Sequence, residues 1–214
     1  MAPTEAHTGR DIMNTNTIAP AVSRLHALAW RPGAEMHSDW WATLGLAAWR
    51  DCYAYPACRA SIDRLIVARR GFPRTSLSPR LDATQSALVA LEPRLEALTI
   101  ALGLLAHGRP DYLLARPYRT LLAAQVGERG CAQLLGLCRD RPVRGPDIAP
   151  DQFVQAVHHN GMSWWRTDTD TCVVAQLLST VLPPASSSPP WPAAPADNLR
   201  GSASDWLVKI GRFL

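Results

Sequence analysis

Residues 88–105 read LVALEPRLEALTIALGLL, and this stretch decides the fold class. Six of its leucines follow one another at spacings of three, four, three, four and three residues: Leu88, Leu91, Leu95, Leu98, Leu102 and Leu105. Such spacing places all of them along one side of an α-helix. Pro93 lies inside the stripe, so the helix either kinks there or restarts with Glu92 and Pro93 in its first turn. We expect a core helix with Leu98 and Leu102 buried at its centre.

The remainder of the chain repeats this helical periodicity. Apolar residues three and four apart predict further helices at about residues 40–52, 60–70, 150–165, 173–182 and 204–213. Proline and glycine separate these segments, and no segment alternates as a half-buried strand does. The sequence therefore predicts an all-α protein, a single compact domain of roughly eight helices with proline-rich loops and a mobile N-terminus.

The composition suggests four consecutive regions. Residues 1–17 are polar and are expected to form a disordered N-terminal tail. Residues 18–182 hold the periodic segments of the helical core domain. Residues 183–197 are rich in proline and serine and predict a loop, because proline interrupts both helices and strands. Residues 198–214 end in an amphipathic segment, which predicts a C-terminal helix packed on the core.

Charge, cysteine content and hydropathy exclude several classes of protein. The net charge of +4 is too small to indicate nucleic-acid binding by itself. The five cysteines include no CxxC pair, so neither a disulfide framework nor a zinc site is indicated, and Cys131 and Cys138 are expected to be buried in a reducing compartment. No signal peptide is visible, and the longest apolar stretch is too short to span a bilayer. We therefore expect a cytosolic protein, or one peripheral to a membrane.

Sequence motifs for catalysis are missing. The chain has no GxSxG, Walker or GxGxxG motif, and its six histidines form no known metal-binding pattern. His158 and His159 together with Asp168 or Asp170 leave open a metal- or ligand-binding helical enzyme, although two ordinary surface histidines explain the pair as well. Gly45 and Gly103 fall inside predicted helices, where close helix approach is a better explanation than phosphate binding. The sequence predicts no enzyme, cofactor, catalytic residue or metal.

Tryptophan pairs and an arginine-rich segment are the candidate binding features. In Trp40-Trp41 and in Trp164-Trp165, either one ring enters the core while the other points elsewhere and can anchor a partner, or both rings are mostly packed at a helix junction. Five arginines at positions 64, 69, 70, 74 and 80 form a basic patch, which fits an acidic protein surface, a nucleic acid or a merely solvated face. The candidate partner-binding residues are His37, Trp40, Trp41, Arg69, Arg70, Trp164, Trp165 and Trp191.

Three blocks of sequence, in order, resemble one family. They are Trp30-Arg31-Pro32 with Met36-His37; residues 102–108, LGLLAHG, continuing through Leu121, Leu122 and Val126 to Gln133; and Gly161-Met162-Ser163-Trp164 with Val181-Leu182-Pro183 and Trp191. Similar blocks occur in the SctK/YscK family of accessory proteins in the sorting platform of bacterial type III secretion injectisomes. The resemblance spans about residues 28–210, and residues 53–86 match it poorly.

The resemblance implies a role in protein transport and virulence. It implies a non-enzymatic cytoplasmic adaptor that links the cytoplasmic domain of the inner-membrane ring protein (SctD type) to the pod-forming, C-ring-like protein (SctQ type). It further implies a location at the cytoplasmic face of the inner membrane as part of the injectisome base. Neither a cofactor, nor nucleic acid, nor direct insertion into the membrane is implied.

Overall fold

A computed structural model describes residues 18–71, 73, 75–138, 145–169, 171–184, 199 and 201–214. Within these ranges every regular element is helical, and no strand occurs. The all-α prediction is confirmed. The predicted tail at residues 1–17 and nearly all of the loop at 183–197 lie outside the described residues, so these boundaries stay predictions.

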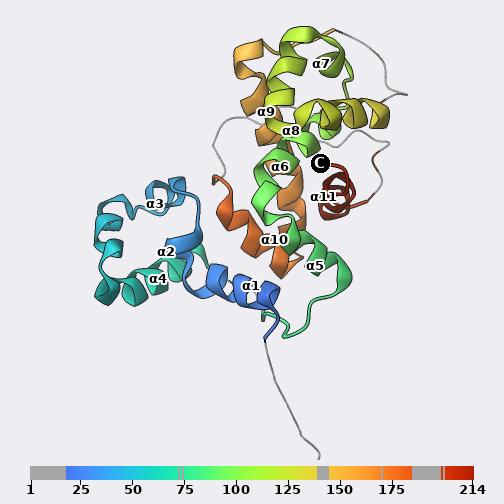
Figure 1. The fold of residues 1–214 in the computed structure, drawn as a ribbon. Helices are drawn as coiled ribbons and strands as arrows, with labels where there is room; N and C mark the ends of the chain where they lie inside the picture. Colours follow the sequence, from blue (N-terminus) through green and yellow to red (C-terminus); the bar gives the residue numbers. More distant parts are fainter. Residues whose placement is uncertain are drawn as a thin grey trace, which may run out of the picture.

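The N-terminal part of the chain forms an arm that projects from the rest of the molecule (Figure 1). The long first helix, α1, spans Pro20–Trp30 and leads into it. The arm itself contains α2 (Pro32–Glu35), α3 (Asp39–Thr43), the 3-10 turns η1 (Ala47–Trp49) and η2 (Asp51–Ala54), and α4 (Pro56–Arg70).

The remaining helices form the body of the molecule. They are α5 (Ala83–Ala90), η3 (Glu92–Arg94), α6 (Leu95–His107), α7 (Asp111–Leu114), α8 (Arg116–Leu137), α9 (Pro150–Thr169), α10 (Val173–Leu178), η4 (Ser179–Val181) and α11 (Ala203–Gly211). Helix α6 lies at the centre of the body, in contact with α8, α9 and α11.

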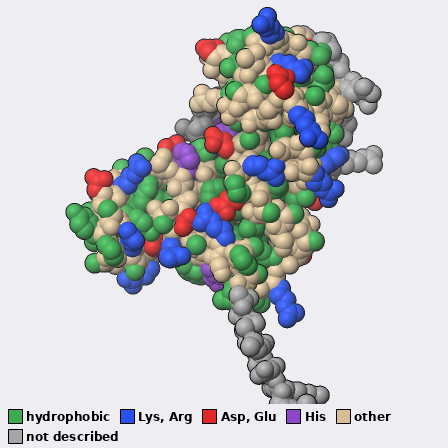
Figure 2. Space-filling view, in the orientation of Figure 1, with side chains coloured by type: hydrophobic (Ala, Val, Ile, Leu, Met, Phe, Trp, Pro, Cys, Tyr) green, Lys and Arg blue, Asp and Glu red, His purple; other side chains and the backbone are tan. Residues whose placement is uncertain are grey.

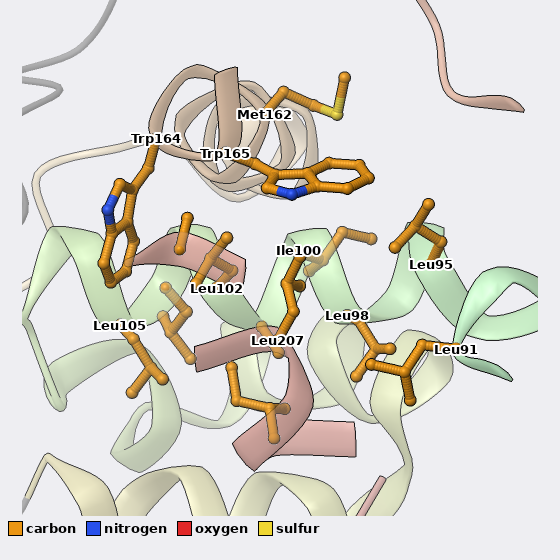
Figure 3. Close-up of a cluster of buried hydrophobic side chains, with 14 of the residues drawn as sticks. Leu91, Leu95, Leu98, Ile100, Leu102, Leu105, Met162, Trp164, Trp165 and Leu207 are labelled. Carbon is orange, nitrogen blue, oxygen red and sulfur yellow. The ribbon is translucent and has the colours of Figure 1, made fainter. Parts of the chain in front are cut away.

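The leucine stripe becomes the main core, but it belongs to two helices rather than one. All six of its leucines are buried, including Leu98 and Leu102 as predicted. The helix is interrupted at Pro93. Helix α5 ends at Ala90, the proline lies in the short turn η3, and α6 begins after it. Figure 3 shows five of these leucines, from Leu91 to Leu105, in one cluster with Trp164 and Trp165 of α9 and Leu207 of α11. Ten residues of α6 are buried, so this helix is covered on several sides rather than along one stripe.

Helices α6 and α9 approach each other so closely that only glycine fits where they cross. A β-carbon added at Gly103 would lie 1.7 Å from the carbonyl oxygen of Val157, and one added at Gly161 would lie 1.9 Å from the carbonyl oxygen of Thr99. The prediction of close helix approach at Gly103 is thus confirmed. The same prediction for Gly45 is wrong, because Gly45 has a φ of 64° and follows the end of α3.

The single helix predicted for residues 40–52 is also wrong. Helix α3 stops at Thr43, the chain turns at Gly45, and η1 and η2 follow as separate 3-10 turns. A left-handed φ favours glycine over every residue with a β-carbon, so Gly45 allows the turn. The apolar residues of this segment do not share one face, since Trp41 and Leu46 are buried whereas Ala48 and Trp49 are exposed.

Candidate functional site

The arm, defined as residues 31–71, has a small hydrophobic core of its own. Five buried side chains form it: Met36, Trp41, Leu46, Ile62 and Ile66. This cluster is separate from the main core, which gathers side chains of α1 and of the body. A core of this size stabilises only a small unit, so polar contacts must fix the geometry of the arm.

A buried carboxylate, Asp63, connects three parts of the arm. Its side chain accepts a hydrogen bond of 2.9 Å from the backbone N–H of Gly33 and one of 3.2 Å from the hydroxyl of Tyr53. Burial raises the pKa of Asp63, and burial together with this neighbouring carboxylate raises the pKa of Tyr53 to about 12. Tyr53 in turn packs edge-on against Trp41, with ring centroids 5.6 Å apart. The carboxylate thus holds α2 and η2 against α4.

The end of α4 is fastened to the arm by two arginines. Arg69 donates hydrogen bonds to the carbonyl oxygens of Leu44 and Gly45, the latter at 3.0 Å. The guanidinium of Arg70 lies over the ring of Trp40, 4.2 Å from its centroid, and burial lowers the pKa of Arg70 to about 10. Both side chains therefore stabilise the arm internally.

The arm is joined to the body by hydrogen bonds from its first turns. The backbone N–H of His37 donates to the carbonyl oxygen of Thr180 at 2.9 Å, and the indole N–H of Trp40 donates to the carbonyl oxygen of Leu182 at 3.0 Å. These acceptors directly precede the proline-rich segment. The joint therefore connects a residue block near the N-terminus with one about 140 positions later.

An ion-pair bridge closes the other side of this joint. Arg24 of α1 forms ion pairs with Glu35 of α2 and with Glu92 of η3. Its Nε donates a hydrogen bond of 2.9 Å to Oε2 of Glu92. These hydrogen bonds raise the pKa of the Arg24 guanidinium, with the bond to Glu92 contributing most. The three side chains border an open cavity of about 490 Å³, to which Glu96 adds another carboxylate. The hollow between arm and body is thus acidic.

A second polar cluster lies in the body, where the segment after residue 144 meets α7. Asp147 accepts a hydrogen bond from the Tyr112 hydroxyl and pairs with Arg109, and the buried Asp111 accepts a hydrogen bond of 2.9 Å from the Gly145 backbone N–H. Burial alone would raise the pKa of Asp147, but the hydrogen bond from Tyr112 and the charge of Arg109 outweigh it and lower that pKa. This network attaches the segment to the helices, because each of its groups is engaged within the protein.

Comparison with protein families identifies the chain. A family model described as a type III secretion system subunit matches residues 23–184. The chain belongs to this family. The match begins within α1, includes the whole arm, and continues through α6 and α9 to the joint at Leu182. Neither the curated proteins nor the solved structures contain a match.

In this type III secretion system subunit, most of the predicted binding residues come together in the arm. His37, Trp40, Trp41, Arg69 and Arg70 all belong to it, and as predicted Trp41 is buried while Trp40 is half-buried. Their predicted role in partner binding stays a prediction. The structure shows that Trp40 also has an internal role, since its indole joins the arm to the body.

In the second tryptophan pair both rings are packed, which is one of the two alternatives that the sequence left open. The exposed fractions of Trp164 and Trp165 are 4% and 1%, so neither ring points to solvent. The reason is that α9 contacts α6, α8, α10 and α11, which cover more than one of its faces. Neither ring is exposed to a partner in this structure, and Trp191 lies outside the described residues.

The aromatic residues that are exposed on the arm were not among the predicted binding residues. Trp49 is 51% exposed and Tyr55 is 67% exposed. Trp49 lies within the segment 40–52, which was predicted to be one helix, and Tyr55 lies just after it. The signal that could have revealed them is Gly45, which ends the helix and separates the aromatics from its buried face.

The alternative of a metal-dependent enzyme receives no support from the described residues. Among them, no group of three or more His, Cys, Asp or Glu side chains is placed to hold a metal ion. His158 and His159 are half-buried on α9, and Asp170 lies outside the described part of the chain. Burial lowers the pKa of His158. In the same part of the chain, no helix is both long and apolar enough to cross a membrane.

Proposed function

We propose that this subunit is an SctK/YscK-type adaptor of the sorting platform, without catalytic activity. It would link the cytoplasmic domain of an SctD-type ring protein to an SctQ-type pod protein at the cytoplasmic face of the inner membrane. The family match over residues 23–184 carries the proposal. The three sequence blocks that resemble the SctK/YscK family support the finer assignment.

The division of the molecule into arm and body fits such a role. An adaptor must hold two neighbours at once, so its two binding surfaces have to be separate. The arm has a core distinct from that of the body and projects from it (Figure 1). One partner can therefore bind to the arm while another binds to the body, without competition for the same surface.

The joint would set the distance and angle between the two partners. It is held by the Arg24 bridge and by the hydrogen bonds from His37 and Trp40. Charge-assisted hydrogen bonds are directional and stronger than neutral ones, so the bridge restrains the orientation of the arm. A defined orientation is what a linker between two parts of a larger assembly requires.

A bridging experiment tests this proposal. The SctD-type cytoplasmic domain is immobilised, and retention of the SctQ-type protein is measured with and without the full chain. We expect retention only when the chain is present. Retention that does not depend on the chain, or displacement of one partner by the other, would contradict the adaptor role.

A further inference from the structure

The outer end of the arm carries an exposed apolar surface, which we call the arm tip (residues 47–57). It contains two of the five large hydrophobic residues that are exposed in the described chain, Trp49 and Tyr55. Small apolar neighbours are exposed with them: Ala47, Ala48, Ala54, Pro56 and Ala57. Figure 2 shows hydrophobic side chains gathered at this end of the arm, with Lys or Arg side chains beside them.

The arm tip is held in one shape from within. Leu46 is fully buried directly before it, and Tyr53 in its middle is fixed by Asp63 and by its edge-on contact with Trp41. Arg59 of α4 donates hydrogen bonds to the carbonyl oxygens of Tyr53 at 3.1 Å and Ala54 at 3.2 Å. The exposed aromatics are therefore presented by a prefolded turn, which lowers the entropy lost on binding.

The arm as a whole exposes more positive than negative charge. Arg50 lies between the two aromatics in the chain, and its side chain forms no hydrogen bond or ion pair within the described residues. Across the arm five arginines are exposed, at positions 31, 50, 59, 64 and 69, against two exposed aspartates at positions 39 and 51. A complementary surface would present carboxylates around an apolar hollow.

We propose that the arm tip is a docking surface for a protein partner whose apolar hollow receives Trp49 and Tyr55 and whose rim is acidic. Tryptophan, tyrosine and arginine are the residues most enriched among those that dominate binding energy in protein interfaces. The proposal rests on the proposed function in one respect, since it takes the two candidate partners of the secretion machine as probes.

A protein partner is favoured over a nucleic acid because of what the arginines already do. Arg59 and Arg69 donate to backbone carbonyl oxygens, and Arg70 lies over Trp40. These contacts leave few guanidinium groups to follow a phosphate backbone. Non-specific binding to nucleic acid depends on many such phosphate contacts.

The test compares variants of the arm tip with matched variants elsewhere. Trp49→Ala and Arg50→Glu change the arm tip, whereas Leu114→Ala on α7 removes a comparably exposed apolar side chain and Arg116→Glu on α8 makes the same charge change. Binding of each full-length variant to the SctD-type domain and to the SctQ-type protein is measured at low and moderate salt. All four positions are exposed, so folding should be preserved, and unfolding midpoints verify this.

We expect Trp49→Ala to weaken binding of one of the two partners by about tenfold or more, and to leave the other unchanged. Arg50→Glu should slow association with the same partner, most strongly at low salt. The two control variants should bind as the unmodified chain does.

Three outcomes would overturn the inference. If the unmodified chain binds a partner and both arm-tip variants bind it equally well, the proposed function survives and the docking surface does not. If the variants instead abolish self-association or binding of a single-stranded oligonucleotide, the occupant is a second copy or a nucleic acid. If the unmodified chain binds neither partner, the proposed function fails together with the inference.

Discussion

The body and the arm are built on different physical principles. In the body, helices surround α6 and pack through a large apolar core. Helices α6 and α9 cross so closely that only glycine fits at the crossing. The arm has five buried apolar side chains and depends on Asp63, Arg69 and Arg70 to hold its short turns together. The loss of one hydrogen bond changes little in a unit held by a large apolar core. It matters far more in a small unit that is held by few hydrogen bonds.

This difference suggests a division of roles. Segments with few buried apolar contacts open at lower free energy than the core of the same protein. We therefore expect the arm to open locally while the body stays folded. A partner could thus change the conformation of the arm while the body stays folded.

The largest effect is expected where the body is packed most tightly. The added methyl group of Gly103→Ala would overlap the carbonyl oxygen of Val157, so α6 and α9 would have to separate. We expect a loss of about 3 kcal/mol or more in the free energy of unfolding. For a chain of this length that corresponds to a fall in Tm of about 6–12 °C, measurable by calorimetry.

Gly136→Ala is the matched control for this prediction. Gly136 also lies within a helix, α8, but a β-carbon there would meet no atom within 4 Å. Alanine is favoured over glycine in helices by up to about 1 kcal/mol, so this variant should be at least as stable as the unmodified chain. Equal unfolding midpoints for Gly103→Ala and Gly136→Ala would show that α6 and α9 do not cross closely enough to require glycine.

The contrast between the regions also explains how far the sequence could predict the structure. In the body, periodicity located α6 and its buried leucines, because a helix buried in a large core must be apolar at regular positions. Gly103 could be interpreted correctly because a glycine within such a helix needs a reason to be there. Both signals are local in the sequence.

In the arm the decisive contacts join distant residues, and the sequence could not reveal them. The Asp63 carboxylate meets Gly33, 30 positions earlier, and the Trp40 indole meets Leu182, 142 positions later. The spacing of Trp41, Leu44, Ala48 and Cys52 suggested one helix, but Gly45 ends it. The sequence left two alternatives open for Trp164 and Trp165, and both are buried because α9 is covered on several sides.

The next largest effect is expected in the arm alone. Asp63→Ala leaves the Gly33 N–H and the Tyr53 hydroxyl without their acceptor, which costs about 1–3 kcal/mol for a buried group. We expect faster hydrogen exchange throughout residues 31–71 and little change in the body. Asp51→Ala, which removes an exposed carboxylate of the same arm, should leave exchange unchanged. Equal loss of protection in arm and body would show that they unfold as one unit.

Acid should affect the body through His107. Burial lowers the pKa of His107 below its usual value of about 6.5, although Asp147 and Asp111 oppose this and Arg109 adds to it. The folded state therefore favours the neutral ring. Its contribution to stability is complete above about pH 6.5 and is lost as the pH falls through the lower pKa of the folded state.

Denaturant unfolding between pH 7.5 and 5.5 measures this contribution. His107→Gln should flatten part of the decline in stability with acidification, whereas His26→Gln, at an exposed position of α1, should not. Asp147 does not interfere, because its lowered pKa places its own loss of stability below about pH 4. An unchanged slope in the His107 variant would mean that this ring does not titrate between the two states as inferred.

The smallest effect is expected at the joint, where the two regions meet. Trp40→Phe keeps an aromatic ring beneath Arg70 but removes the N–H that donates to the carbonyl oxygen of Leu182. The net contribution of such a hydrogen bond is about 0.5–1.5 kcal/mol, and the Arg24 bridge and the His37 hydrogen bond remain. The arm should therefore stay attached but sample a wider range of angles, seen as a broader distance distribution between spin labels on α4 and α8. Trp30→Phe, at an exposed position of α1, is the control and should leave the distribution unchanged. If Trp40→Phe left the distribution equally narrow, the ion pairs alone would fix the arm, and the indole would serve only the interior of the arm through its contact with Arg70.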